Sequence, residues 1–425
     1  MRFCRIRRGA LATAAIAALA AGTLILGSDA TAASRADASG GAANRATSAS
    51  LKRITRRVSL LSKHRRSRPR QKPSRRGPGV GRRSSPKPQP QPSPRRPAPR
   101  GATGSVYGIS FDNPEYLDAA TRNRELDAIA GMGARWIRFD IKWSDVQWDG
   151  PASFNWSKYD PLVDAARARG FTILADLAYS PTWARPAGTN DKFGPDTDGR
   201  RSAFAAFAEA AVRHFAGRVG HWEVWNEPNG PIFWAPRPKP ADYAALLDVA
   251  YARIKAADPG AYVLAGATAP ASSDGTWIDE VEFVSAVYGS GGKGDFDGWS
   301  HHPYTVSPTF AHNDNAWYQV FGTSPSIRSV MAANGDAGKL VWGTEFGPPT
   351  SGGPNAMSEA EQADQVTKAY GLWRSHSWAG PLFVYTQRDK RPYGASADSF
   401  DYYGMLRYDF SPKPVWTAYR AMAAT

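Results

Sequence analysis

The sequence predicts a (β/α)8 TIM barrel that follows an export signal and a basic, proline-rich linker. Between residues 106 and 423, short apolar runs alternate eight times with helical stretches, which is the pattern of a parallel sheet built from βα units. Residues 34–100 contain no phenylalanine, tyrosine or tryptophan. The first 33 residues combine arginines with one apolar run. We therefore expect a signal peptide at 1–33, a disordered linker at 34–100 and one barrel domain at 101–425.

The N-terminal segment has the three parts of an export signal. Arginines at positions 2, 5, 7 and 8 precede an apolar run over 10–27, and Ala-Thr-Ala follows at 30–32 as a small-residue cleavage pattern. An uncleaved membrane anchor is the alternative, because the run approaches the length that spans a bilayer. Cys4, the only cysteine, precedes the run, so no disulfide is expected in the mature protein. We expect a secreted protein, either free or associated with the cell surface.

The linker holds the excess positive charge of the chain. The whole chain carries +15, residues 34–100 carry +19, and residues 101–425 carry −7. Nucleic acid is not expected as a partner, because this segment has no aromatic side chain to stack on bases. An anionic cell envelope is a better match for its charge. Apolar residues at 51, 54, 58 and 61 predict either a basic amphipathic helix on such a surface or a solvated spacer.

Eight strands and their connecting helices account for the barrel. The strands are expected to begin near residues 106, 134, 171, 219, 261, 296, 339 and 381. Helices are expected, among others, over 161–169, 202–215, 243–257, 359–373 and 415–423. A doubly wound open sheet is the alternative, but no glycine-rich nucleotide loop follows the first strand. The sequence therefore favours a closed barrel with enlarged loops, and no cofactor is expected.

Two glutamates stand where barrel strands are expected to end. Glu227 follows the fourth strand and Glu345 follows the seventh. Active sites of TIM barrels lie at the carboxyl ends of the strands, so these two side chains are expected to converge. Cleavage of a glycosidic bond needs such a pair, with one carboxyl group to protonate the leaving oxygen and one carboxylate to attack the sugar. The two glutamates are therefore our candidate catalytic residues.

The motifs around these glutamates resemble glycoside hydrolase clan A. Residues 225–228 read Trp-Asn-Glu-Pro, residues 302–304 read His-Pro-Tyr, and residues 342–347 read Trp-Gly-Thr-Glu-Phe-Gly. Residues 136–140, Trp-Ile-Arg-Phe-Asp, resemble the second-strand arginine segment of families 5 and 39. Four motifs occur in the clan's order across residues 106–423, with family 39 as the nearer match.

The resemblance implies roles for six residues. Glu227 would be the acid/base, Glu345 the nucleophile, and Asn226 a hydrogen-bond partner of the sugar 2-hydroxyl. Three further residues would support them. Arg138 would keep Glu345 ionised, while His302 and Tyr304 would orient the nucleophile and the sugar. The resemblance thus implies a retaining mechanism.

Two departures from the clan affect specificity. Tyr385 occupies the eighth strand where many members of the clan place a sugar-stacking tryptophan, and we retain it as a substrate-binding candidate. After Trp416 the chain forms one helix and stops, without the accessory β-sandwich of family 39 xylosidases. Specificity for xylosides is therefore not implied.

Loop tryptophans are the remaining substrate-binding candidates. Trp143, Trp183, Trp234 and, less directly, Trp277 fall in βα loops, where flat apolar rings suit the faces of sugars. Tryptophans inside predicted strands are expected in the core; these are Trp136, Trp222 and Trp299. Loops bearing aromatic rings on several sides of the mouth predict an extended groove and internal cleavage of a polymer.

Two other features have a simpler interpretation. Glu223 shares a strand face with Glu227, but it lies deeper, so a buried, paired charge is expected rather than a third catalytic carboxylate. His301 and His302 are adjacent in a strand and point to opposite faces, and no third ligand is spaced nearby. A metal site is therefore not expected.

The sequence predicts a retaining hydrolase that cleaves inside a β-linked polysaccharide, and we expect a monomer. A non-catalytic cell-wall or matrix glycan-binding protein is one alternative, which the complete set of site residues disfavours. A transglycosylase is the other, since it would use the same two carboxylates. The sugar and the linkage remain open.

Overall fold

The computed structural model describes residues 105–304 and 316–425, with side chains of the second range described from residue 319. The expected signal segment and linker lie outside the described residues. Within the described ranges, no helix is long and apolar enough to cross a bilayer.

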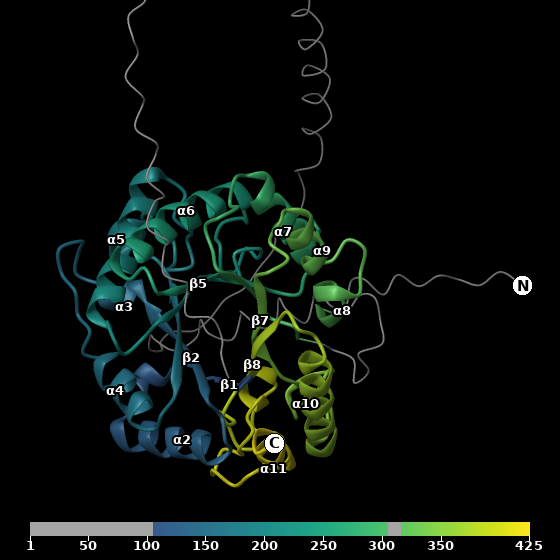
Figure 1. The fold of residues 1–425 in the computed structure, drawn as a ribbon. Coiled ribbons are helices and arrows are strands. Elements are labelled where there is room, and N and C mark those ends of the chain that lie inside the picture. Colours follow the sequence, from purple (N-terminus) through teal and green to yellow (C-terminus); the bar gives the residue numbers. More distant parts are fainter. Residues whose placement is uncertain (1–104, 305–315) are drawn as a thin grey trace, which may run out of the picture. The chain divides into compact units, whose positions relative to one another are not determined.

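Eight parallel strands form a closed barrel in the order β1 to β8, as the sequence predicts. Helices surround the strands on the outside (Figure 1). The strands are β1 (Tyr107–Ser110), β2 (Trp136–Lys142), β3 (Thr172–Ala178), β4 (His221–Asn226), β5 (Tyr262–Thr268), β6 (Gly298–His301), β7 (Leu340–Phe346) and β8 (Ala379–Tyr385). Closure comes from β1 pairing with β8, for example Ser110 with Tyr385.

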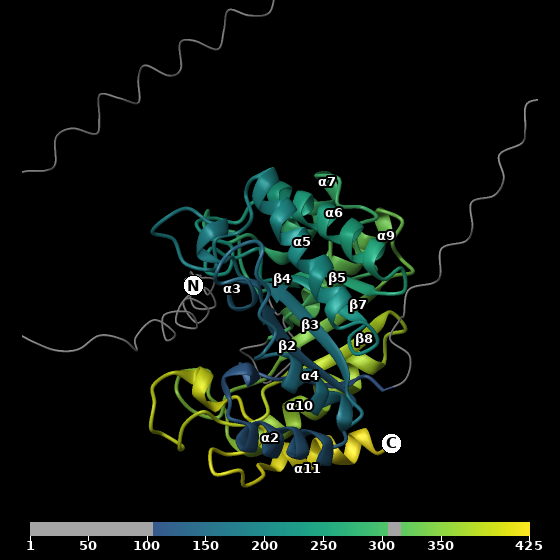
Figure 2. The same cartoon turned by 90° about the vertical axis from the view of Figure 1, so that its left-hand side faces the viewer.

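The helices that the sequence predicts are present with small shifts of their ends. These are α4 (Asp160–Ala168), α5 (Asp198–His214), α6 (Pro240–Ala257), α10 (Glu359–Arg374) and α11 (Pro414–Ala423). Others that it did not delimit are α2 (Ala119–Gly131), α3 (Trp143–Val146), α7 (Glu280–Gly289), α8 (Ala316–Phe321) and α9 (Ile327–Ala333). The last helix, α11, lies beside α2 and α10 and completes the outer layer (Figure 2).

Local sequence fixes where these helices begin. The Asp118 side chain accepts hydrogen bonds from the backbone N–H groups of Ala120 and Thr121, both at 2.9 Å, and so caps α2. Ser358 and Glu361 form a reciprocal capping box at the start of α10. Each device satisfies N–H groups that have no partner within the helix.

Large apolar side chains fill the amino-terminal end of the barrel. Trp136, Trp342, Tyr262 and Phe383 form a buried cluster, in which the rings of Trp136 and Trp342 meet edge to face at 5.1 Å. Polar side chains occupy the level above, towards the carboxyl ends of the strands. The inward-facing polar groups thus meet at the carboxyl-terminal mouth, where active sites of TIM barrels lie.

Candidate active site

Glu227 and Glu345 converge at the mouth of the barrel. Glu345 is the penultimate residue of β7 and Glu227 directly follows β4. One atom, His302 Nδ1, lies 2.8 Å from Glu227 Oε1 and 3.8 Å from Glu345 Oε2. The side chains remain 11% and 16% exposed. Both carboxyl groups therefore border the same small volume and can be reached from solvent.

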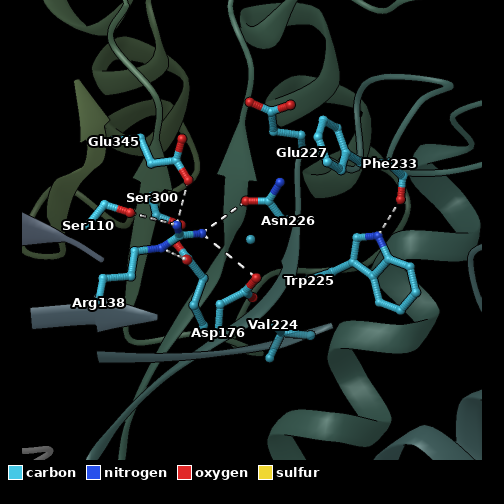
Figure 3. A network of polar contacts seen from close by, with 12 residues as sticks. Ser110, Arg138, Asp176, Val224, Trp225, Asn226, Glu227, Phe233, Ser300 and Glu345 are labelled. Atoms are coloured by element: carbon cyan, nitrogen blue, oxygen red, sulfur yellow. Dashed lines mark hydrogen bonds and ion pairs between the residues drawn. The ribbon is translucent and has the colours of Figure 1, made fainter. Parts of the chain in front are cut away.

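Arg138 on β2 connects this volume to the barrel interior (Figure 3). Its Nη1 lies 2.6 Å from Glu345 Oε1, and its Nη2 donates to Asn226 Oδ1 at 2.9 Å. Below, Nε lies 2.6 Å from Glu223 Oε2 and Nη2 lies 3.7 Å from Asp176 Oδ2. Glu223 is fully buried, which confirms the prediction of a paired interior charge.

Burial beneath the site shifts the pKa of Asp176. Burial raises the pKa of this carboxyl group well above its ordinary value, and the nearby charges of Asp140 and Glu223 add to the effect. Arg138 works in the opposite direction without overcoming it. Burial thus favours the neutral form of Asp176, whereas Arg138 makes its shorter contacts, both 2.6 Å, with Glu223 and Glu345.

Burial also dominates the ionisation of Glu345. It raises the pKa of Glu345 to about 7, although Arg138 and the hydrogen bond from Tyr304 lower it. The expected contact with Arg138 is present, but its charge does not by itself hold the carboxylate ionised. The reason is that transfer from water to the barrel mouth penalises the charged form more than one shared guanidinium favours it.

His302 and Tyr304 each form a hydrogen bond with a different catalytic glutamate. The Tyr304 hydroxyl donates to Glu345 Oε2 at 2.7 Å, as the resemblance implies for a group that orients the nucleophile. His302 instead bonds Glu227 through Nδ1. Burial lowers the pKa of His302, so its ring is neutral. A neutral imidazole can donate to ionised Glu227 or accept from protonated Glu227, depending on its tautomer.

The backbone at the end of β4 has an unusual conformation that the sequence motif did not reveal. Trp225 and Glu227 have φ angles of 71° and 45°, a region that non-glycine residues rarely occupy. Gly266 on β5 makes this possible, because a side chain there would collide with the carbonyl oxygens of Val224 and Trp225. The Trp225 indole N–H donates to the Phe233 carbonyl at 2.7 Å and anchors the following loop.

A family model of cellulases, glycosyl hydrolase family 5, matches residues 100–379. This range contains β1 to β7 and every side chain of the site described above. The chain belongs to glycosyl hydrolase family 5.

Curated relatives align over less than a third of the chain. Beta-glucosidase 6 of Oryza sativa subsp. japonica is 33% identical over 109 residues, which are 25% of this chain and 20% of that protein. Thermostable beta-glucosidase B of Thermobispora bispora is 30% identical over 133 residues, which are 30% and 26% of the two chains. The aligned region thus spans about a quarter or less of either relative.

Solved structures share the barrel over a longer range. A family 39 glycoside hydrolase from Bacteroides cellulosilyticus WH2 superposes with a TM-score of 0.59 and 25% identity, covering 75% of this chain and 63% of that one. A family 5 enzyme from Streptomyces cattleya, solved with Manb1-4GlcNAc, gives 0.56 and 17%, covering 75% and 80%. The second comparison supports the fold alone.

For two of the tryptophans in this family 5 chain, the prediction of sugar binding is wrong. Trp143 is fully buried, with its ring stacked on Phe207 at 6.0 Å. Trp234 is 1% exposed and packs against Trp225. These rings pack against side chains of α5 and α6, Phe207 and Tyr243, so neither offers a face to a sugar. Trp277 is also buried.

Trp183 is partly exposed, and its indole N–H donates to the Gln147 carbonyl at 2.7 Å. Two neighbouring aromatic residues that sequence analysis did not single out are more accessible. Tyr116, after β1, is 56% exposed, and Trp148, after β2, is 61% exposed. The only signal available from sequence was their position in loops that follow strands.

Tyr385 ends β8 and is 6% exposed. Its ring meets the Tyr304 ring edge on at 6.4 Å, so it lies next to the residue that bonds Glu345. The peptide bond between Tyr385 and Thr386 is cis. Tyr385 therefore borders the site, although burial leaves little of its ring to face a sugar.

Among residues 105–304 and 316–425, no group of three histidine, cysteine, aspartate or glutamate side chains is arranged to hold a metal ion. The two adjacent histidines have separate partners. His301 Nδ1 lies 2.9 Å from the Thr268 hydroxyl, whereas His302 bonds Glu227.

Proposed function

We propose that the chain is a retaining glycoside hydrolase that cleaves β-linked glycans, with Glu345 as nucleophile and Glu227 as acid/base. The observation that carries this proposal is the shared contact of both carboxyl groups with His302 Nδ1, at 2.8 Å and 3.8 Å. Retaining enzymes hold their two carboxyl groups about 5–5.5 Å apart, whereas inverting enzymes leave about 6.5–9.5 Å for a water molecule. Because His302 Nδ1 lies close to both carboxyl groups, the structure favours the shorter separation between them, which is that of retaining enzymes.

In the first step, a Glu345 carboxylate oxygen attacks the anomeric carbon while Glu227 gives its proton to the departing glycosidic oxygen. The carbon–oxygen bond to the leaving group breaks, and an ester to Glu345 forms. In the second step, Glu227 takes a proton from water, whose oxygen displaces Glu345. The sugar is released with its original configuration, and both glutamates return to their starting states.

The surrounding side chains fit these steps. Arg138 and Tyr304 each hold one oxygen of Glu345, at 2.6 Å and 2.7 Å, which restricts rotation of the nucleophile. Asn226 has its carbonyl oxygen held by Arg138. Its amide N–H₂ group is thereby oriented away from Arg138, as donation to a sugar hydroxyl requires.

Trapping the intermediate tests the catalytic pair. Glu227→Ala removes general-acid help but leaves the nucleophile intact, so activated aryl glycosides should still react while hydrolysis slows by about 10²–10⁴-fold. A covalent glycosyl adduct on Glu345 should then accumulate and be seen by intact-mass spectrometry and peptide mapping. Glu345→Gln should give neither turnover nor adduct.

Glu209→Gln, on the outer helix α5, is the matched control and should behave as wild type. No adduct in Glu227→Ala, or an inverted anomer from the wild type by NMR, would rule out the assigned mechanism.

We further propose that the substrate is a polysaccharide cleaved internally. The exposed rings of Tyr116 and Trp148, on the loops after β1 and β2, support a binding surface longer than one sugar. Viscosity of the correct polymer should therefore fall well before reducing ends accumulate. Trp148→Ala should weaken cleavage of the polymer about tenfold and spare aryl monoglycosides. Monosaccharide as the sole early product would contradict internal cleavage.

A further inference from the structure

A salt bridge between Asp112 and Lys390 lies on the side of the barrel mouth that carries Glu345. Neither residue belongs to the sequence motifs or to the catalytic pair. Asp112 follows β1, and Lys390 lies in the connection after β8. Lys390 Nζ is 2.7 Å from Asp112 Oδ2, and the side chains are 37% and 19% exposed. Both charges can therefore be reached from the mouth.

A chain of contacts fixes the position of this pair relative to Glu345. Tyr304 bonds Glu345, the Tyr385 ring meets the Tyr304 ring at 6.4 Å, and Lys390 Nζ lies 3.4 Å from the Tyr385 hydroxyl. Because Glu227 protonates the leaving group, the leaving group must lie on the side of Glu227. The pair, on the side of Glu345, faces the sugar that is transferred to the enzyme.

The backbone around the pair has its own hydrogen bonds. The Lys390 N–H donates to the Asp401 carbonyl at 2.9 Å, and the Asp112 N–H donates to the Thr386 hydroxyl at 3.4 Å. A partly exposed ion pair contributes little to stability. Stabilisation of these loops is therefore not a sufficient reason for placing Asp112 and Lys390 at the mouth.

The pair keeps hydrogen-bonding capacity for a ligand. An ammonium group has three donors, and two of those of Lys390 serve Asp112 and Tyr385, which leaves one for a ligand. The Asp112 carboxylate accepts from Lys390 and from the Asn113 amide at 2.8 Å, and about four acceptor positions are available to a carboxylate. Burial acts to raise the pKa of Asp112, but Lys390 outweighs it and keeps the pKa below its ordinary value. The carboxylate is therefore ionised.

We propose that Asp112 and Lys390 together bind two neighbouring hydroxyl groups of the transferred sugar, the carboxylate accepting from one and the ammonium donating to the other. This assignment rests on the proposed hydrolase function. It specifies a neutral sugar ring with adjacent hydroxyls, because the carboxylate of a uronic acid would meet Asp112 and disturb a pair whose charges already balance.

Combining enzyme and substrate changes tests the assignment. The wild type and Lys390→Met are compared on aryl β-glycosides of the preferred sugar and on analogues in which each hydroxyl in turn is replaced by hydrogen. Loss of a hydrogen bond to a charged group should lower wild-type kcat/KM by about 10–100-fold for one or two analogues. Lys390→Met should lower activity on the parent by a similar factor and show little further loss on the analogue that lacks the lysine-bound hydroxyl. Asp112→Ala should do the same for the adjacent hydroxyl.

Lys368→Met removes an ion-paired lysine from the outer helix α10 and should leave every value unchanged. Lys390→Arg keeps the charge and donors and should recover part of the selectivity. A uniform loss across all analogues in Lys390→Met, or an unchanged penalty for each missing hydroxyl, would overturn the assignment. No turnover of any parent glycoside by the wild type would instead overturn the proposed function, and the assignment with it.

Discussion

At the scale of single residues, the two catalytic glutamates differ in the side chains that contact them. Glu345 is held by a cation and a phenol, Arg138 and Tyr304, while Glu227 is bonded by the neutral ring of His302. A nucleophile must be ionised and a general acid must be protonated in the same complex. The structure gives the two carboxyl groups different partners, a cation and a phenol for Glu345 and an imidazole for Glu227.

The pH dependence of kcat/KM should report the ionisation of Glu345. Burial raises the pKa of this group to about 7, and only its deprotonated form can attack. Activity should therefore rise with pH and reach half of its limiting value near pH 7 on the acid limb. Steady-state rates on an activated aryl glycoside, measured from pH 4 to 9, provide the check. A flat acid limb down to pH 5 would contradict the expectation.

Removing the Tyr304 hydroxyl should shift that limb. Its hydrogen bond favours ionised Glu345 and lowers the pKa, so Tyr304→Phe should raise the pKa and move the acid limb to higher pH by roughly one unit. Tyr403→Phe is the matched control, because the Tyr403 ring packs 5.9 Å from Tyr304 and no bond from its hydroxyl to Glu345 is seen among the described residues. A shift to lower pH in Tyr304→Phe would count against this account.

At the scale of elements, the junction of β4 and β5 positions the acid/base. The end of β4 adopts positive φ angles at Trp225 and Glu227, and the neighbouring strand must leave space for the displaced carbonyl groups. Gly266 leaves that space. The catalytic position of Glu227 thus depends on a residue in another strand.

Gly266→Ala should therefore damage both stability and activity. The added methyl group would meet two backbone carbonyls, and overpacking of this kind costs about 1–3 kcal/mol of unfolding free energy. A displacement of Glu227 by even about 1 Å could lower kcat on the order of 10²-fold. Gly371→Ala in α10, where a side chain would meet nothing within 4 Å, should be neutral or slightly stabilising. Denaturant unfolding and kcat together test this; wild-type kcat in Gly266→Ala would refute it.

At the scale of the whole molecule, charge and catalysis are divided along the chain. Residues 34–100 carry +19, whereas residues 101–425 carry −7. We propose that the protein is exported and that the basic segment holds it on an anionic cell envelope. The barrel would then act close to the surface without needing positive charge of its own.

Deleting residues 34–100 should leave turnover of a small soluble glycoside unchanged and abolish retention on cell envelopes. In the intact protein this retention should weaken as ionic strength rises, because salt screens charges at separations beyond about 10 Å at 0.1 M. A variant that keeps the segment but replaces its lysines and arginines with glutamine separates charge from length. Equal retention of all three proteins in a sedimentation assay would exclude the proposal.

The sequence alone determined the barrel and its two candidate glutamates. Eight alternating units and the positions of Glu227 and Glu345 at expected strand ends are local features, because strand periodicity and motif spacing are written in consecutive residues. The paired charge on Glu223 also followed from strand alternation. The helix expected over 359–373 is present as α10, because helical periodicity is also a local feature.

Only the tertiary structure decided which side chains reach the site and in what electrical state. Trp143 begins the short helix α3 and Trp234 lies in a loop, both in connections that follow strands, but their rings pack into the core. The raised pKa of Glu345 depends on burial by distant segments. Likewise, Asp112 and Lys390 are 278 positions apart in the chain and meet because β1 pairs with β8. Exposure, electrostatics and ring closure each depend on contacts between residues far apart in sequence, which local patterns do not encode.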